Sequence, residues 1–166
     1  MLDSYAYRCE FGQMNGPQHD ILGFGVSAVM DLNAQHETWH LEQRRRAMCC
    51  LPQERFKPDL LAAALVGLFG IAGNRIHDAL EPAEHPNHRG FFHSWLLFAV
   101  IGRETLSHHQ RLCTGQTSGT EARLLNGIGW GSCSHFASDA TTAKSLPITG
   151  LFFSPPRRGR RVRRVR

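Results

Sequence analysis

Histidine and carboxylate side chains gather in two segments of the chain. Residues 78–93 (DALEPAEHPNHRGFFH) contain Asp78, Glu81, Glu84, His85, His88 and His93. Residues 134–139 (SHFASD) place His135 four positions before Asp139. Two side chains at this spacing share one face of a helix, about 5–6 Å apart at Cβ, so both can reach one ion. The pattern predicts a divalent-metal site, for which imidazole and carboxylate ligands favour zinc, although manganese and iron accept the same set.

Both patterns also have a purely structural interpretation. An isolated HxxxD pair occurs often by chance and commonly forms a hydrogen bond on a helix surface. Residues 78–93 are equally compatible with a solvated, charged turn. Each segment adjoins an apolar run, however, and burying Asp or His is costly unless the group is paired or coordinated. This context favours the metal site, and the structural alternative stays open.

A third pattern is His36–His40 (HETWH), which matches the HExxH helix of zinc proteases. Its flanks, LNAQ and LEQRRR, are polar, whereas a zinc protease needs a helix that faces a buried cleft. Gln43 and Arg46 also occupy the Gly and His positions of the extended motif. We therefore expect an exposed helix away from the metal site, and a zinc protease is the least favoured hypothesis.

The elements that position these residues are predicted to be helices. The length of 166 residues suits one domain, and 42% hydrophobic with 20% charged residues suits a folded chain. No repeat and no alternating strand pattern is visible, so the predicted fold class is mostly α, a single helical domain. Helical segments are expected at 19–30, 34–50, 60–73, 91–102 and 121–142, with a turn-rich segment at 74–89 and a flexible connector at 107–120. The predicted boundaries are an N-terminal extension (1–13), the helical domain (14–153) and a disordered Arg-rich tail (154–166).

Charge and cysteine usage exclude several classes of protein. The net charge of +5 arises from the tail, where seven Arg lie between Arg157 and Arg166, and the rest of the chain has 12 basic against 14 acidic residues. Nucleic acid is therefore expected to bind only nonspecifically, through the tail. Five Cys without a CxxC pair argue against a disulfide framework and a thiolate zinc cluster. The N-terminus does not resemble a signal peptide.

Two apolar runs, 60–73 and 91–102, suggest contact with a membrane. Fourteen helical residues span roughly 21 Å, less than the roughly 30 Å hydrocarbon core of a bilayer. We therefore expect two short helices that pack together and offer an apolar face to lipid, rather than clean membrane spans.

Three blocks of the sequence resemble, in order, the motifs of a known family. They are MNGPQH (14–19), DALEPAEHPNHRGFFHSW (78–95) and SHFASDATTAKSLPITG (134–150). Together they are similar to the YdjM-like family of bacteria, LexA-regulated and inner-membrane-associated metal-dependent hydrolases. The chain departs from the family pattern at His77, where the family usually has Pro, and at Ala143, where Pro is expected.

The resemblance implies a site and an activity. The positions that match metal ligands are His19, Asp78, His93, His135 and Asp139. By the same resemblance, His88 is a further candidate ligand or phosphate contact. In the mechanism expected for such a site, Asp78 bridges metals or acts as a base. Glu81 and Glu84 are candidates to hydrogen-bond to the ligands without contacting the metal themselves. The ligand order is also similar to that of zinc-dependent phospholipase C, an analogy that suggests hydrolysis of phosphoesters by a metal-activated water.

The expected function is thus a membrane-associated metal-dependent hydrolase on the cytoplasmic side of the inner membrane, acting on a small-molecule or lipid-like substrate. A cytoplasmic location is the alternative. The rival from another functional class is a non-catalytic helical protein whose cluster only binds metal or is structural.

Overall fold

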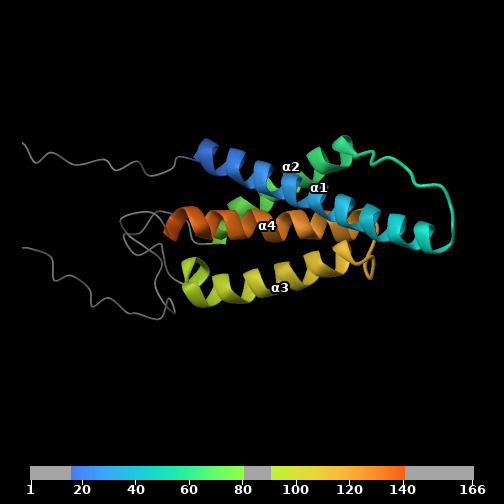
Figure 1. Cartoon of the computed structure of the whole chain (residues 1–166). Helices are drawn as coiled ribbons and strands as arrows, with labels where there is room; N and C mark the ends of the chain where they lie inside the picture. Colours follow the sequence, from blue (N-terminus) through green and yellow to red (C-terminus); the bar gives the residue numbers. More distant parts are fainter. Residues whose placement is uncertain (1–15, 81–90, 141–166) are drawn as a thin grey trace, which may run out of the picture.

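The computed structural model of the protein describes residues 16–80 and 91–140 (Figure 1). Four helices are present there: α1 (Gly16–Met48), α2 (Leu60–Leu80), α3 (Trp95–Cys113) and α4 (Thr120–Ala140), with a short 3-10 turn, η1 (Phe91–His93), before α3. No strand occurs in these ranges. The mostly α fold class predicted from the sequence is confirmed.

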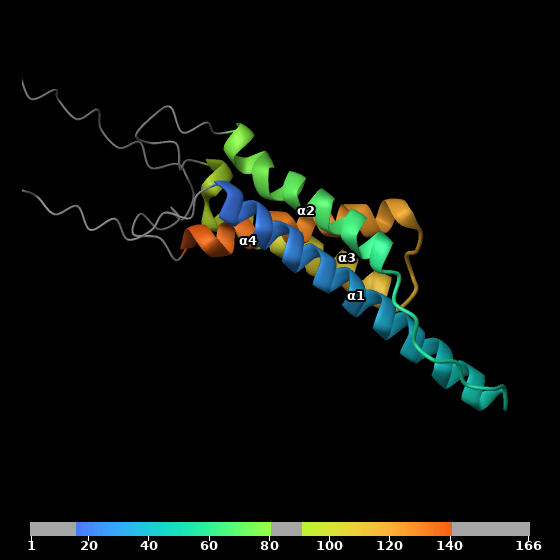
Figure 2. The same cartoon turned by 90° about the horizontal axis from the view of Figure 1, so that it is seen from above.

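The helices alternate in direction. α1 and α3 begin at one end of the bundle, and α2 and α4 finish at that same end (Figures 1 and 2). α1, α2 and α4 pack against one another, and α3 packs mainly on α4. The C-terminal part of α1 extends beyond the other helices, with the 49–59 segment running back along it (Figure 2). One end of the bundle therefore contains the starts of α1 and α3 and the ends of α2 and α4. We call it the functional end.

Local capping explains where two helices begin. The Ser94 hydroxyl accepts a hydrogen bond from the Leu97 N–H at 3.2 Å, so Ser94 is the N-cap of α3. The Asp59 carboxylate accepts from the Ala62 N–H at 2.9 Å, which caps α2. After α3 the chain turns at Gly115, whose φ of +70° favours glycine. The cap at Ser94 fixes the position of His93 directly before it.

Three boundaries differ from the sequence prediction. The two segments expected at 19–30 and 34–50 form one 33-residue helix, α1. Residues 74–80, predicted as part of a turn-rich segment, are the last two turns of α2. Residues 107–113, predicted as a connector, continue α3, so the connection to α4 is only 114–119. In each case polar residues that resemble a loop in sequence face the interior of a helical bundle, as Asn74 and His109 do.

The interior of the bundle is made of small and polar side chains. Among the described residues six hydrophobic side chains are buried, against fifteen polar or charged ones. Glycines bring the helix backbones together: a Cβ at Gly131 of α4 would collide with the carbonyl oxygen of Gly70 of α2, and one at Gly73 with the carbonyl oxygen of Ile128. Such small-residue contacts are typical of helices that associate without a large apolar core.

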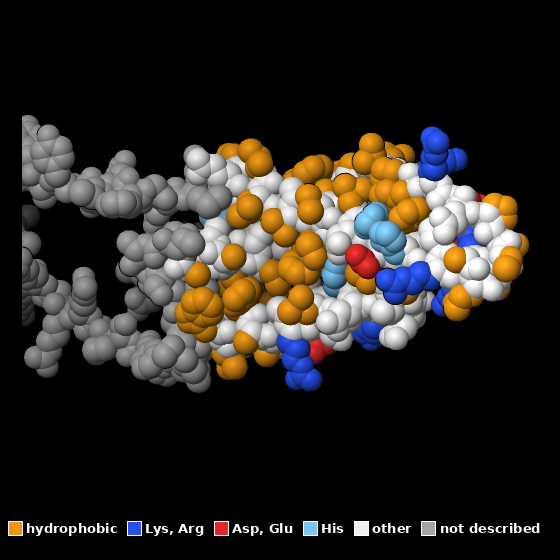
Figure 3. Space-filling view, in the orientation of Figure 1, with side chains coloured by type: hydrophobic (Ala, Val, Ile, Leu, Met, Phe, Trp, Pro, Cys, Tyr) orange, Lys and Arg blue, Asp and Glu red, His pale blue; other side chains and the backbone are white. Residues whose placement is uncertain are grey.

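Much of the exterior is apolar. Sixteen large hydrophobic side chains are exposed within residues 16–80 and 91–140. Hydrophobic side chains are spread over much of the face shown in Figure 3. α2 is long and apolar enough to cross a membrane by length and composition, a test that the core helix of a soluble protein also passes. This corrects the expectation that the apolar run is too short, because the helix has 21 residues rather than fourteen. The run 91–102 contacts α2 through η1, whereas α2 and α3 both pack on α4.

Several predictions fall outside the described residues. They concern the N-terminal extension 1–13, the basic tail 154–166, and the residues Glu81, Glu84, His85, His88 and Ala143.

Candidate metal centre

Four segments of the chain bring five His and Asp side chains to the functional end. α1 supplies His19 from its first turn, and α2 supplies Asp78 from its last turn. His93 ends η1, and His135 and Asp139 lie one turn apart near the end of α4. These are the five residues that the sequence analysis proposed as ligands, and the structure places them together.

The ligand atoms of three of these residues, Asp78, His93 and His135, lie within 4.8 Å of one another. His93 Nε2 is 3.2 Å from Asp78 Oδ1 and 3.2 Å from His135 Nε2. His135 Nε2 is 3.6 Å from Asp78 Oδ1. Asp139 Oδ2 lies 3.5 Å from His135 Nε2 and 3.9 Å from His93 Nε2.

These separations are also compatible with a metal ion shared by the three side chains. Ligands that each lie about 2.0–2.2 Å from a tetrahedral ion are about 3.3–3.6 Å from one another. Two imidazole Nε2 atoms at 3.2 Å would repel each other through their lone pairs unless a proton or a cation lies between them. The donor set could therefore hold a divalent metal ion.

His19 adds a fourth element to the site. Its ring centroid is 5.0 Å from that of His135, and its Nδ1 is 3.0 Å from the Ser138 hydroxyl oxygen. Because the Ser138 hydroxyl donates to the His135 carbonyl at 2.7 Å, His19 Nδ1–H is the donor in their shared hydrogen bond. This tautomer leaves the lone pair of His19 on Nε2, the form that a metal ligand requires.

The surroundings favour the protonation states that bind metal. Burial is the main cause that lowers the pKa of His135, against the opposing influence of the Asp78 and Asp139 carboxylates. The hydrogen bond with His93 is the main cause that lowers the pKa of Asp78. At neutral pH the imidazole is therefore neutral and the carboxylate ionised, as coordination demands.

The cluster is closed on one side and open on the other. His93 and His135 are buried, whereas the Asp78 side chain is 63% exposed. Asp78 and His19 line a cavity of about 410 Å³ between the start of α1 and the end of α2. A substrate or a water molecule can approach the cluster from this cavity.

Sequence reasoning missed three residues around the site. Ser138, which orients His19, carries no motif beyond its place between His135 and Asp139. His77 was noted only as a departure from a family pattern, yet its buried ring lies 5.5 Å from that of His135. Arg75 pairs with Asp20 across the cavity and is the main cause that lowers the pKa of that carboxyl group. No local spacing could reveal this pair, because 55 residues separate its members.

The HExxH segment lies apart from the cluster. His36 is seventeen positions after His19 on α1, about 25 Å along the helix. Its ring packs against those of His40, Trp39 and Phe56, and His40 is exposed. This arrangement agrees with the expectation of a separate, solvated helix.

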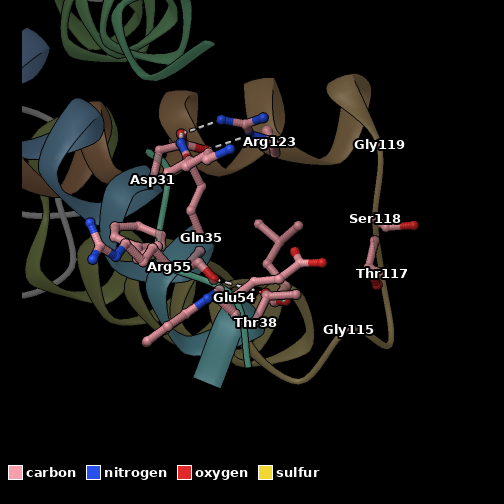
Figure 4. Close-up of a pocket in the computed structure, with 15 residues that line it drawn as sticks. Asp31, Gln35, Thr38, Glu54, Arg55, Gly115, Thr117, Ser118, Gly119 and Arg123 are labelled. Carbon is pink, nitrogen blue, oxygen red and sulfur yellow. Dashed lines mark hydrogen bonds and ion pairs between the residues drawn. The ribbon is translucent and has the colours of Figure 1, made fainter. Parts of the chain in front are cut away.

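A second cavity of about 430 Å³ lies at the opposite end of the bundle, between α1, the 54–57 segment and the α3–α4 connection (Figure 4). Its buried charges are already paired. Arg123 donates two hydrogen bonds to the Asp31 carboxylate, at 2.8 and 2.6 Å, and the Gln35 amide donates a third at 2.8 Å. This network ties α1 to α4 and contributes no metal ligand.

Comparison with known proteins identified no relative of the chain. No protein-family model matches the chain, and neither the curated proteins nor the solved structures contain a match to it.

Proposed function

We propose that the protein is a metal-dependent hydrolase of phosphoesters that works at a membrane surface, and that it belongs to the YdjM-like family. The observation that supports this most directly is the convergence of Asp78, His93 and His135 at the functional end. A bound divalent ion would lower the pKa of its water to about 7 and polarise a phosphoryl oxygen. The remaining chemistry is assigned to side chains of this chain.

Each residue of the cluster has a distinct role in this proposal. His93, His135 and Asp139 would hold the ion from the buried side of the cluster, and His19 would bind it from α1. Asp78 would be a ligand and also lines the open cavity with an exposed side chain, so we assign to it the role of accepting a proton from the attacking water.

Membrane association is supported by the inverted distribution of side chains. The interior is polar, while large apolar side chains such as Leu65, Leu68 and Val100 are exposed. Contiguous exposed apolar surface marks a site of contact with lipid or protein. The exposed charges Arg103 and Glu104 follow the apolar start of α3, so we propose that the bundle lies at the membrane surface, on the cytoplasmic side, rather than across the bilayer.

An assay of phosphoester hydrolysis tests the proposed activity. Zinc-loaded protein should hydrolyse 4-nitrophenyl phosphate or bis(4-nitrophenyl) phosphate, and the manganese-loaded and iron-loaded forms provide the comparison. Asp78→Asn should lower kcat by at least about 100-fold, because it removes the base and one ligand charge. His40→Ala is the matched control and should retain full activity. Bound metal without hydrolysis of either ester would favour the non-catalytic alternative.

The basic tail is proposed to act separately from this site. Deleting residues 155–166 should abolish salt-sensitive, nonspecific binding of nucleic acid and leave the metal content unchanged.

A further inference from the structure

The cavity beside Asp78 has one arginine in its lining, Arg75. We propose that Arg75 selects the substrate by binding an unesterified phosphate oxygen, and that Asp20 holds its guanidinium group in place. The inference rests on the proposed hydrolase function and names the class of substrate, a phosphate ester with at least one free anionic oxygen.

The helix geometry places Arg75 next to the reacting position. Arg75 and Asp78 are three residues apart on α2, so they share a face with Cβ atoms about 5–6 Å apart. Both line the same cavity of about 410 Å³, together with His19. A phosphate that contacts the metal cluster from this cavity therefore lies within reach of a long arginine side chain.

The pairing with Asp20 leaves part of the guanidinium group available. Arg75 Nε donates to Asp20 Oδ1 at 2.8 Å, and Nη2 donates to Asp20 Oδ2. A guanidinium group has five N–H donors. The two on Nη1 have no hydrogen-bond partner among the residues that the structure describes, and the side chain is 68% exposed. Asp20 thus fixes the plane of the group while Nη1 remains free to bind an anion.

The charges around the cavity make this binding depend on metal. Asp20, Asp78 and the neighbouring ligand Asp139 contribute three negative charges against the single positive charge of Arg75. Without a cation in the cluster these charges disfavour phosphate, whereas a divalent ion would cancel the excess negative charge and offer phosphate a direct contact. Phosphate binding should therefore appear only after metal loading.

The test measures inorganic phosphate binding by calorimetry, after the zinc content of each sample has been determined. Arg75→Gln and Arg75→Lys should keep the zinc content and weaken phosphate binding at least about tenfold, because a fixed, charge-assisted contact is lost. The lysine variant retains a cation for Asp20, so it keeps the helix pairing if the glutamine variant unfolds. Arg44→Gln, which changes an exposed arginine at the far end of α1, should not alter phosphate binding.

Asp20→Asn distinguishes substrate selection from a merely structural ion pair. The asparagine keeps one oxygen that accepts from Arg75 and removes a negative charge from the cavity, so phosphate binding should tighten by roughly threefold. A structural pair predicts the opposite pattern, in which the variants at both positions lower the melting temperature and leave phosphate affinity unchanged. That result overturns the inference.

Failure of the proposed function gives a different result. A folded protein that takes up no zinc overturns both the function and this inference. A zinc-loaded protein whose phosphate affinity is the same in the wild type and Arg75→Lys overturns the inference alone.

A further experiment distinguishes two sources of the phosphate group, a lipid headgroup and a soluble ester. Phosphatidylcholine vesicles with phosphatidic acid are compared with glycerol 3-phosphate as competitors for inorganic phosphate. Stronger competition by the vesicles, lost in Arg75→Gln, assigns a lipid headgroup. Equal competition assigns a soluble ester, and no competition by either overturns the inference.

Discussion

His77 shows how a single residue beside the cluster affects stability. It is buried, its ring lies 4.3 Å from that of Phe136, and burial followed by the charges of His135 and His93 lowers its pKa to about 4. In the unfolded chain its pKa is about 6.5. Between these two values the unfolded state binds more protons, so the free energy of unfolding falls as the pH drops from 6.5 towards 4.

The prediction is that His77→Phe removes much of this acid sensitivity. Metal-free wild type should lose about 2 kcal/mol of stability from this group between pH 7 and pH 5, and the variant should lose that much less. Urea titrations at the two pH values measure the difference. His40→Phe, at an exposed position of α1, should remain as acid-sensitive as the wild type. If His77→Phe is equally sensitive, another group is responsible.

At this scale, sequence reasoning identified the five clustered residues but not the contacts between them. Only His135 and Asp139 are related by a local helical spacing. Only the resemblance to a family pointed to His19, and His93 was one of several histidines and carboxylates in residues 78–93. The approach of both to His135 depends on helix packing over more than 40 residues of sequence. The pairing of Arg75 with Asp20 has no local signal at all.

The packing of the helices depends on close contacts between their backbones. Gly131 lies one turn before His135 on α4, and its Cα faces the Gly70 carbonyl of α2. This contact sets the distance between the helices that carry His135 and Asp78. The packing of α4 on α2 is therefore part of the metal centre.

Gly131→Ala should accordingly lower both stability and metal affinity. The added methyl group meets backbone atoms that cannot rotate away, so the helices must separate, at a cost of about 1–3 kcal/mol. Gly102→Ala is the matched control, because nothing lies within 4 Å of a Cβ at that position of α3, and it should gain about 0.5–1 kcal/mol. Thermal unfolding and zinc titration check both variants. Equal behaviour would mean that the α2–α4 contact is not tight.

The sequence predicted the presence of the helices more accurately than the residues at which they begin and end. Apolar runs located the cores of α2 and α3, but residues 74–80 and 107–113 resembled loops because they contain Asn, His and Gln. These residues are helical because the interior of the bundle is itself polar. For example, His109 Nε2 lies 3.2 Å from Asn33 Oδ1 of α1. Composition cannot reveal which polar residues will be buried in this way.

At the scale of the whole bundle, large apolar side chains are exposed around an interior that is mostly polar in the part of the chain that the structure describes. Leu65 and Leu68 lie on the exposed side of α2. Replacing both with serine should weaken binding to anionic vesicles by about 2 kcal/mol, since each loses an apolar side chain that would otherwise enter lipid. Vesicle flotation measures this effect.

High salt provides the control for this experiment. Contact through apolar side chains survives high salt, whereas the contribution of the Arg-rich tail, about 1 kcal/mol per Arg near the surface, is screened. Wild type that is released completely by salt, or a double variant that floats as well as the wild type, would contradict the proposed role of the exposed leucines.

Four distant segments of the chain are proposed to form one metal centre, and the metal content of the purified protein tests this proposal. Elemental analysis of protein purified without added metal should find at least about one zinc, manganese or iron ion per chain. His135→Ala and Asp78→Asn should each lose most of it, whereas His40→Ala and a chain lacking residues 155–166 should keep it. Wild-type protein that is folded but metal-free, or His135→Ala with its metal fully retained, would show that these segments do not form a metal centre.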